Sequence, residues 1–236
     1  MAAATRRSNP PLLVVFDGQS FNVVPPWEGS ILGRSYPYRL LHDMDQYDLG
    51  RPRYGIPGTV PAISGQSWTD LAATVETRIY PLAASATRTA LVMCGGTTDI
   101  NTGDSGATLY ADHVSYADGC RAAGFDIIIA TTLLGSTSFT GGEITARTDF
   151  NTLLLADAED AFDGIADVDA AFVALYGAAY WDETPPFFDG VHMYGESCAE
   201  FARVVGPVLW PLIEALPMAR AEPARAGGYS HLADGV

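Results

Sequence analysis

Lysine is absent from this 236-residue chain, and all 13 of its basic residues are arginine. With 28 acidic residues, the formal net charge is −15. A chain this acidic lacks the clustered positive charge that nucleic-acid phosphates and anionic membrane surfaces require. We therefore expect neither as a partner. The lysine-free composition, rich in alanine, aspartate and glycine, suggests a high-GC genome, such as that of an actinobacterium or one of its phages.

Cysteine is scarce, and Cys94, Cys120 and Cys198 lie far apart in the chain. An odd, widely spaced set is typical of buried free thiols rather than of a disulfide framework or a zinc site, although it leaves room for one disulfide. No cluster of His, Cys and carboxylates has the spacing of a metal site, and no glycine-rich phosphate loop with a lysine is present. We expect no metal and no cofactor.

Long apolar segments are also missing. Residues 1–9 contain Arg6 and Arg7 but no hydrophobic region of a secretory signal, and no later run has the length of a membrane span. The expectation is cytoplasmic synthesis without an export signal, although release by lysis or within a virion would leave no such trace. We expect residues 1–10 to form a flexible N-terminus and residues 217–236 a flexible C-terminal tail.

The hydrophobic content of 48% is sufficient for one core, which we assign to a single domain over residues 11–216. The candidate strands are Leu12–Phe16, Thr59–Ile63, Thr89–Cys94, Phe125–Leu134 and, as a strand or strand–helix junction, Val168–Leu175. The candidate helices are 36–44, 68–82 with Ser67 as N-cap, 107–123 ending at Gly124, 143–162, and 196–216 with interruptions at Pro207 and Pro211. This alternation predicts an α/β fold: a three-layer α/β/α, flavodoxin-like domain with a parallel sheet of about five strands.

The first candidate strand leads directly into Gly18-Gln19-Ser20. Its near-continuous apolar run is typical of a central parallel strand that is buried on both faces. A serine at the carboxyl end of such a strand lies where open α/β sheets bind their ligands. Turns also contain Gly and Ser for backbone reasons, so Ser20 needs a chemical partner elsewhere in the chain.

Asp189 and His192 lie three residues apart, just before the closing helix. A serine hydroxyl becomes a good nucleophile when a base accepts its proton, and a carboxylate on the other ring nitrogen orients a histidine base. The structural alternative is that Asp189 caps the loop and His192 packs among aromatic neighbours. For the other histidines, we expect His42 and His113 on helix surfaces and His231 in the tail.

Four segments resemble, in order, the characteristic blocks of the SGNH/GDSL hydrolase family: Gly18-Gln19-Ser20, Gly65, Gly96-Thr97-Thr98-Asp99 and Asp189-Gly190-Val191-His192. The resemblance covers roughly Leu12 to Leu216. It implies a flavodoxin-like hydrolase without a cofactor. Such enzymes cleave carboxylic esters, often acetyl esters on carbohydrates or acyl esters of lipids.

By this resemblance, Ser20 is the nucleophile, His192 the general base and Asp189 its orienting partner. The backbone N–H groups of Ser20 and Gly65 are the implied oxyanion donors. The family usually has Asp before the serine, whereas this chain has Gln19. The Gly-Gln-Ser variant is more similar to some carbohydrate O-acetylesterases of the same superfamily.

The third block departs further from the family pattern, because Thr98 stands where an Asn amide normally donates to the oxyanion. Either the Thr98 hydroxyl replaces that amide, Asn101 or Asn22 reaches the site, or the oxyanion hole has two donors. The rival serines, Ser67 and Ser197, lie at expected helix starts and have structural explanations.

Tryptophans on or beside the expected loops, namely Trp27, Trp68 and Trp181, are candidate substrate contacts, although each could instead cover the edge of the core. We expect Asp99 to stabilise its own loop. The leading hypothesis is a serine esterase that acts on an acetyl or short acyl ester, with glycan O-deacetylation preferred. The alternatives are a non-catalytic glycan-binding or structural module on the same fold, and a thioesterase or lysophospholipase for longer acyl chains.

Overall fold

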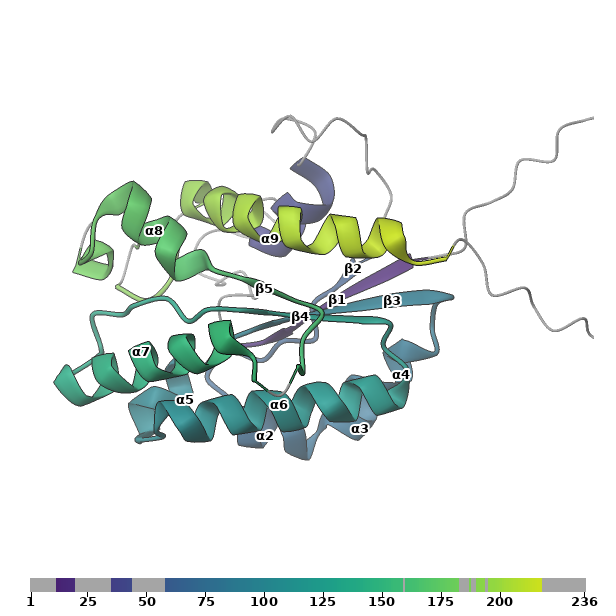
Figure 1. Ribbon diagram of the computed structural model, residues 1–236, viewed down its shortest axis with the longest axis horizontal. Coiled ribbons are helices and arrows are strands. Elements are labelled where there is room, and N and C mark those ends of the chain that lie inside the picture. The colour runs from purple at the N-terminus through teal and green to yellow at the C-terminus, as the bar shows by residue number, and fades with distance from the viewer. Residues whose placement is uncertain are drawn as a thin grey trace, which may run out of the picture.

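The computed structural model describes residues 12–19, 35–43, 58–158, 160–182, 187, 190–193 and 195–217. The predicted flexible ends lie outside these ranges, apart from Pro217. Within them, the chain forms one sheet with helices on both faces (Figure 1).

The sheet contains five parallel strands in the order β2-β1-β3-β4-β5. The strands are β1 (Leu12–Gly18), β2 (Gly58–Thr59), β3 (Arg88–Cys94), β4 (Ile127–Thr131) and β5 (Gly164–Ala166). This strand order is that of flavodoxin-like sheets, in which ligands bind beyond the carboxyl ends of the strands. The predicted fold class is therefore confirmed.

Two helical layers enclose the sheet, as Figure 1 shows. One layer contains α1 (Tyr36–Tyr38), the π-helix η4 (Arg39–Asp43), α8 (Val168–Tyr176) and α9 (Gly195–Ala215). The other contains α2 (Trp68–Ala73), α3 (Val75–Arg78), α4 (Tyr80–Ala83), α5 (Thr97–Thr102), α6 (Gly106–Ala123) and α7 (Gly141–Ala156). A short 3-10 helix, η6 (Tyr180–Asp182), follows α8.

Side chains of the central strands divide between two hydrophobic clusters. Val14 and Phe16 of β1 belong to the cluster under α9, whereas Val15 belongs to the cluster under α6. Alternate residues of a strand point to opposite faces, so a strand that is buried on both faces must be apolar at nearly every position. This explains the continuous apolar runs in the sequence.

Several local signals predicted the helix ends correctly. Ser67 caps α2 in a reciprocal arrangement with Asp70, and Gly124 ends α6 in the left-handed conformation. The single helix expected over 68–82 is instead three short segments, with breaks at Thr74 and Ile79. The second strand is also shorter than expected.

The prediction for the fifth strand was wrong in position. Residues 168–175 belong to helix α8, and the strand is the three-residue segment β5 before it. Asp167 accepts a hydrogen bond from Ala170 N (3.1 Å) and caps α8. Helix α7 also ends earlier than predicted, because Asp157 adopts the left-handed conformation there.

The predicted interruption of the closing helix was also wrong, since α9 continues through Pro207 and Pro211. Both prolines are exposed, and the carbonyl groups that lose a helical donor to them belong to Arg203 and Pro207 on the same exposed side. Water can hydrogen-bond to these carbonyl groups, so the helix need not break.

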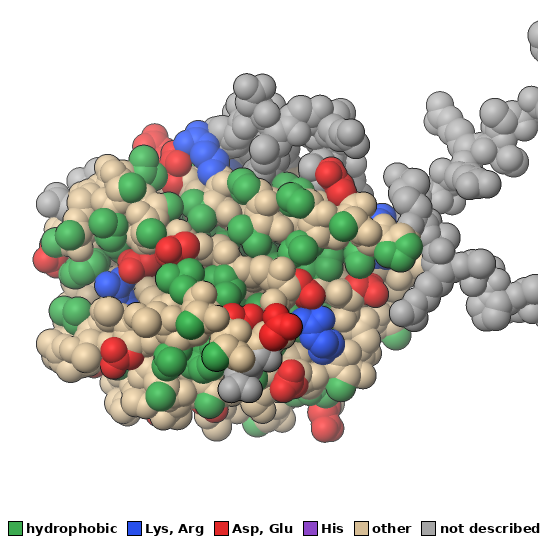
Figure 2. Space-filling model, viewed as in Figure 1, with side chains coloured by type: hydrophobic (Ala, Val, Ile, Leu, Met, Phe, Trp, Pro, Cys, Tyr) green, Lys and Arg blue, Asp and Glu red, His purple; other side chains and the backbone are tan. Residues whose placement is uncertain are grey.

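All three cysteines are buried free thiols, as predicted. Burial raises the pKa of Cys94 and of Cys120 to about 12. Figure 2 shows acidic side chains scattered over both helical layers of the visible face. Among the described segments, no helix is both long enough and apolar enough to cross a membrane.

Candidate active site at the carboxyl edge of the sheet

Five of the predicted site residues are described by the structure: Gly65, Trp68, Thr98, Trp181 and His192. The other three, Ser20, Trp27 and Asp189, lie outside the described residues, as does Asn22. Gln19, next to Ser20, and Gly190, next to Asp189, are described, and their contacts show how the end of β1 and the loop before α9 are held.

The end of β1 is tied to the segments that follow both of its neighbouring strands. Gln19 N donates to the carbonyl oxygen of Cys94 (3.1 Å), and Ile63 N donates to that of Gly18 (3.0 Å). Gly65 lies in the turn two residues after Ile63. The backbone of Gly18 and Gln19, which leads to Ser20, is therefore held from both sides, and Gly18 is bonded close to the start of the Gly65 turn.

The side chain of Gln19 connects β1 to the turn after β3. Its Oε1 accepts hydrogen bonds from Gly96 N (3.0 Å) and Thr98 N (3.1 Å), and its Nε2 donates to Asp99 Oδ2 (2.6 Å). Gln19 is 1% exposed, so water does not compete for these bonds. The first and third family-like blocks are thus joined by one side chain.

Asp99 is fully buried, and its Oδ1 accepts a hydrogen bond from Trp68 N at the start of α2 (2.7 Å). Burial raises the pKa of Asp99, and the bonds from Trp68 N and Gln19 partly oppose that effect. The expectation that Asp99 stabilises its own loop was too narrow, because both partners belong to distant segments. We call the bonded pair Gln19 and Asp99 the Gln19–Asp99 clamp.

A second buried carboxylate, Asp17, lies three residues before Ser20 on β1. It forms an ion pair with Arg78 of α3 and accepts a hydrogen bond from the Tyr116 hydroxyl of α6. Arg78 also donates to the carbonyl oxygen of Pro61 (3.1 Å). This cluster holds β1, two helices and the segment that leads to Gly65 in one arrangement.

The loop that carries His192 is closed at its base. Phe187 and Met193 form an antiparallel bridge, and both are buried in the core under α9. Gly190 accepts a hydrogen bond from Thr137 N (3.0 Å). Gly190 has a φ of +78°, and a Cβ there would lie 1.9 Å from Thr137 Oγ1, so only glycine fits. The loop that carries His192 is consequently hydrogen-bonded to the segment after β4.

That segment is supported in turn by Asp169 of α8. Asp169 pairs with Arg147 (2.5 Å) and accepts hydrogen bonds from the Tyr180 hydroxyl (2.6 Å) and Asn151 Nδ2 (3.2 Å). The Tyr180 hydroxyl accepts from Gly135 N (2.6 Å). This network was not predicted, because none of its members forms a recognisable motif in the sequence.

The predicted tryptophans differ in exposure. Trp181 is half-buried, packs against Gly135 and lies 5.1 Å from the Arg147 guanidinium, as measured to the ring centroid. Trp68 is 1% exposed, with its ring centroid 4.3 Å from that of His113. Burial leaves Trp68 without a ring face for a substrate, so it is not supported as a contact residue.

His113 was expected on a helix surface, and this prediction was wrong. It is fully buried between Trp68 and Phe150, and its Nδ1 lies 2.9 Å from the carbonyl oxygen of Leu109. Burial lowers the pKa of His113 to about 4. The imidazole is therefore neutral at neutral pH and belongs to the core.

Thr98 lies in the first turn of α5 and is half-buried. Its backbone N–H is used by Gln19, and its hydroxyl makes no hydrogen bond to any residue in the described part of the chain. The side chain of Asn101 instead contacts Ser138 Oγ through both Nδ2 and Oδ1 (3.2 Å each). Of the rival serines, Ser67 is a helix cap and Ser197 is buried in α9.

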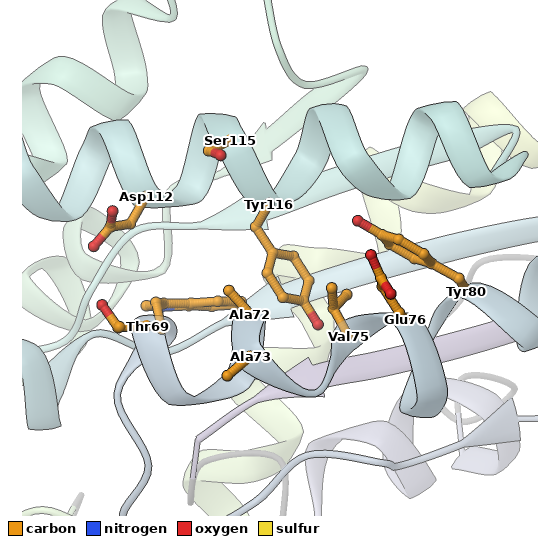
Figure 3. Close-up of a pocket in the computed structure, with 10 residues that line it drawn as sticks. Thr69, Ala72, Ala73, Val75, Glu76, Tyr80, Asp112, Ser115 and Tyr116 are labelled. Carbon is orange, nitrogen blue, oxygen red and sulfur yellow. The ribbon is translucent and has the colours of Figure 1, made fainter.

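A groove of about 600 Å³ lies between α2–α4 and α6 (Figure 3). Figure 3 shows Tyr116 descending from α6, and the carboxylates of Glu76 and Asp112 also line the groove. Of the described candidate residues, Trp68 alone lines it. No group of three His, Cys, Asp or Glu suited to a metal ion occurs in the described ranges.

Solved structures share this architecture. A G-D-S-L lipolytic protein from Veillonella parvula DSM 2008 has a TM-score of 0.63 and 17% identity, covering 84% of this chain and 98% of its own. The acetylxylan esterase Axe2 from Geobacillus stearothermophilus has a TM-score of 0.58 and 17% identity, with 89% and 96% covered. A protein named TesA has a TM-score of 0.61 and 18% identity, with 85% and 99% covered.

No protein-family model matches the sequence, and no curated protein is significantly similar to it. The chain nevertheless shares the fold of a G-D-S-L lipolytic protein and of an acetylxylan esterase, as expected from the resemblance of its four sequence blocks. At these identities the likeness is one of fold, and the chemistry must be argued from the residues of this chain.

Proposed function

We propose that this protein is a serine carboxylic ester hydrolase of the SGNH type, with Ser20, His192 and Asp189 as its catalytic triad. The observation that carries the proposal is the convergence of three segments at one sheet edge. Gln19 binds the turn after β3, and the His192 loop is bonded to the segment after β4. In this fold, that edge is where ligands bind.

In the proposed reaction, the Ser20 hydroxyl attacks the ester carbonyl carbon while His192 accepts its proton. His192 then donates that proton to the departing alcohol, leaving an acyl group on Ser20. Water, deprotonated by His192, then attacks the acyl carbon; the bond to Ser20 Oγ breaks, the carboxylic acid leaves, and His192 returns the proton to Ser20. Asp189 orients the imidazole in both halves of the reaction.

Charge develops on the carbonyl oxygen at each attack, and preorganised donors stabilise it. The proposed donors are the backbone N–H groups of Ser20 and Gly65, together with the hydroxyl of Thr98. The structure supports a place for Thr98 because its hydroxyl makes no bond within the described part of the chain. A threonine hydroxyl can donate one hydrogen bond to an oxyanion.

An acetyl or short acyl ester is the proposed substrate, with O-deacetylation of a glycan preferred. Two observations support this choice: the Gly18-Gln19-Ser20 variant of the first block, and the likeness of fold to an acetylxylan esterase. Trp181 is half-buried beside Gly135, in the segment after β4, and is the proposed contact for a sugar or acyl group.

Replacement of Ser20 by Ala tests the proposal. We expect hydrolysis of p-nitrophenyl acetate to fall by at least ~1000-fold, because triad members act as a unit and one loss removes most of the catalysis. A fluorophosphonate probe should label Ser20 in the parent, as peptide mapping would show.

Ser67→Ala is the matched control, since Ser67 is the rival serine and caps α2. It should retain turnover while losing roughly 1 kcal/mol of stability. Undiminished turnover in Ser20→Ala would exclude Ser20 as the nucleophile.

A second candidate function is a non-catalytic glycan-binding module, which Thr98 in place of the family Asn favours. It predicts a parent protein without turnover and without probe labelling. Calorimetric titration with an acetylated xylooligosaccharide would then show equal affinity in the parent and in Ser20→Ala.

A further inference from the structure

We propose that Gln19 is a positioning residue, whose pairing with Asp99 aligns the turn that carries Thr98 with the nucleophile Ser20. This inference rests on the proposed esterase function. It concerns two residues that take no direct part in the proposed bond-making steps.

The connectivity of Gln19 is the first argument. Its backbone precedes Ser20 by one peptide bond, and its side chain makes three hydrogen bonds of 2.6 to 3.1 Å to Gly96, Thr98 and Asp99. Any shift of the turn after β3 relative to Ser20 must break at least one of them. Both members of the clamp are 1% exposed or less, so water cannot replace a lost partner without cost.

The chemistry of the four polar atoms is the second argument. Gln19 Oε1 faces two backbone N–H donors, while Nε2 faces a carboxylate that also accepts from Trp68 N. These partners determine the orientation of the amide, since a flipped amide would place donors against donors. A glutamate at position 19, which has the same length as Gln19, would place a carboxylate against that of Asp99 instead.

The clamp also determines which group of Thr98 can serve the reaction. Its backbone N–H donates to Gln19, whereas its hydroxyl is without a partner in the described residues. Residue 98 therefore offers its side chain, and the clamp holds the backbone from which that side chain projects. In this way, Gln19 acts on the oxyanion through Thr98.

In the part of the chain that the structure describes, few other charged groups lie near the clamp. Asp104 acts on Asp99 by like-charge repulsion, and His113, which packs on Trp68, is neutral at neutral pH. Asp17, two residues before Gln19, is paired with Arg78. A change in the charge at position 19 should therefore be felt mainly by Asp99.

A reciprocal exchange tests the clamp. In Gln19→Glu, two carboxylates face one another, and in Asp99→Asn, two amide N–H groups do. We expect each single variant to lose roughly 100-fold in kcat for p-nitrophenyl acetate, comparable to the loss of one oxyanion donor, with little change in KM.

The double variant Gln19→Glu/Asp99→Asn restores every donor–acceptor contact. The amide introduced at position 99 can accept from Trp68 N and donate to the carboxylate introduced at position 19. The kcat of this variant should recover to within about tenfold of the parent, a coupling that independent sites do not show. Asp118→Asn on the exposed face of α6 makes the same chemical change outside the clamp and should leave kcat unchanged.

The pH profile separates positioning from a loss of folding. Two carboxylates in contact share one proton, so the ratio of kcat in Gln19→Glu to kcat in the parent should rise as pH falls. Because the parent is measured at the same pH, any pH dependence that the two proteins share cancels in this ratio.

Equal kcat in Gln19→Glu and the parent would overturn the inference. A folded double variant no more active than the single variants would also overturn it, with circular dichroism as the check on folding. Should a single variant fail to fold, the double variant is compared directly with the parent under the same criterion. A parent that neither turns over the ester nor reacts with the fluorophosphonate would instead overturn the proposed function, and this inference with it.

Discussion

Two buried carboxylates near the end of β1 are stabilised in different ways. Asp17 has a cation, Arg78, and a phenol, Tyr116, as partners. Asp99 accepts hydrogen bonds from the amide of Gln19 and from Trp68 N, and within the described residues no cation contacts it. Both side chains are fully buried.

The difference indicates a division of roles. A charge that is neutralised by a buried cation holds structural elements together, and its loss is felt mainly in stability. A carboxylate held only by neutral donors keeps a raised pKa, and such groups are frequent at functional sites. We therefore expect changes around Asp17 to affect unfolding, and changes around Asp99 to affect turnover.

The largest expected effect on stability follows from breaking the Asp17 ion pair. Arg78→Met keeps the apolar stem but removes the cation from a buried ion pair, in which the Arg78 side chain is only 13% exposed and that of Asp17 is fully buried. The free energy of unfolding, measured in urea, should fall by about 3–5 kcal/mol.

Arg121→Ala is the control for that change. It removes an arginine from the more exposed pair with Asp163, and its cost should stay below ~1 kcal/mol. Equal losses in the two variants would show that the buried pair has no special structural role.

His113 packs on Trp68, whose backbone N–H donates to Asp99, and it should cause a loss of stability in acid. Its folded pKa of about 4 lies below the ordinary histidine value, so the unfolded chain binds the proton first as pH falls. Stability is unaffected by this group above about pH 6.5 and decreases by about 3 kcal/mol as pH falls to about 4.

Urea unfolding at pH 7 and pH 4.5 checks this expectation, with His113→Phe as the comparison. The difference in unfolding free energy between parent and variant should shift in favour of the variant at the lower pH. A difference that does not vary with pH would show that His113 is not held neutral in the folded state.

The smallest expected effect comes from Tyr116→Phe, which removes the hydroxyl that donates to Asp17 and accepts from Arg78 Nη2 (3.0 Å), while the Asp17–Arg78 ion pair stays in place. A hydrogen bond to a charged group contributes roughly 1.5–3 kcal/mol. Unfolding free energy should fall by that amount, while kcat for p-nitrophenyl acetate remains that of the parent. A marked loss of kcat without a loss of stability would contradict the division between the two carboxylates.

Much of the architecture could be predicted from the sequence, because its signals are local. The apolar runs that became β1, β3 and β4 reflect burial on both faces, and Ser67 and Gly124 mark helix ends through their own backbone chemistry. The strand β5 gave no such signal. Its three residues become a strand only by pairing with β4.

The sequence by itself determined the fold class and the blocks that suggest an ester hydrolase. Only the tertiary structure decided which side chains join those blocks. The bond between Gln19 and Asp99 spans 80 positions, and that between Asp99 and Trp68 N spans 31. His113 is buried because α2 and α7 pack around it, which no local pattern on α6 reveals. The physical reason is the same in each case: burial and hydrogen bonding depend on partners that are distant in the chain and meet only when the layers close on the sheet.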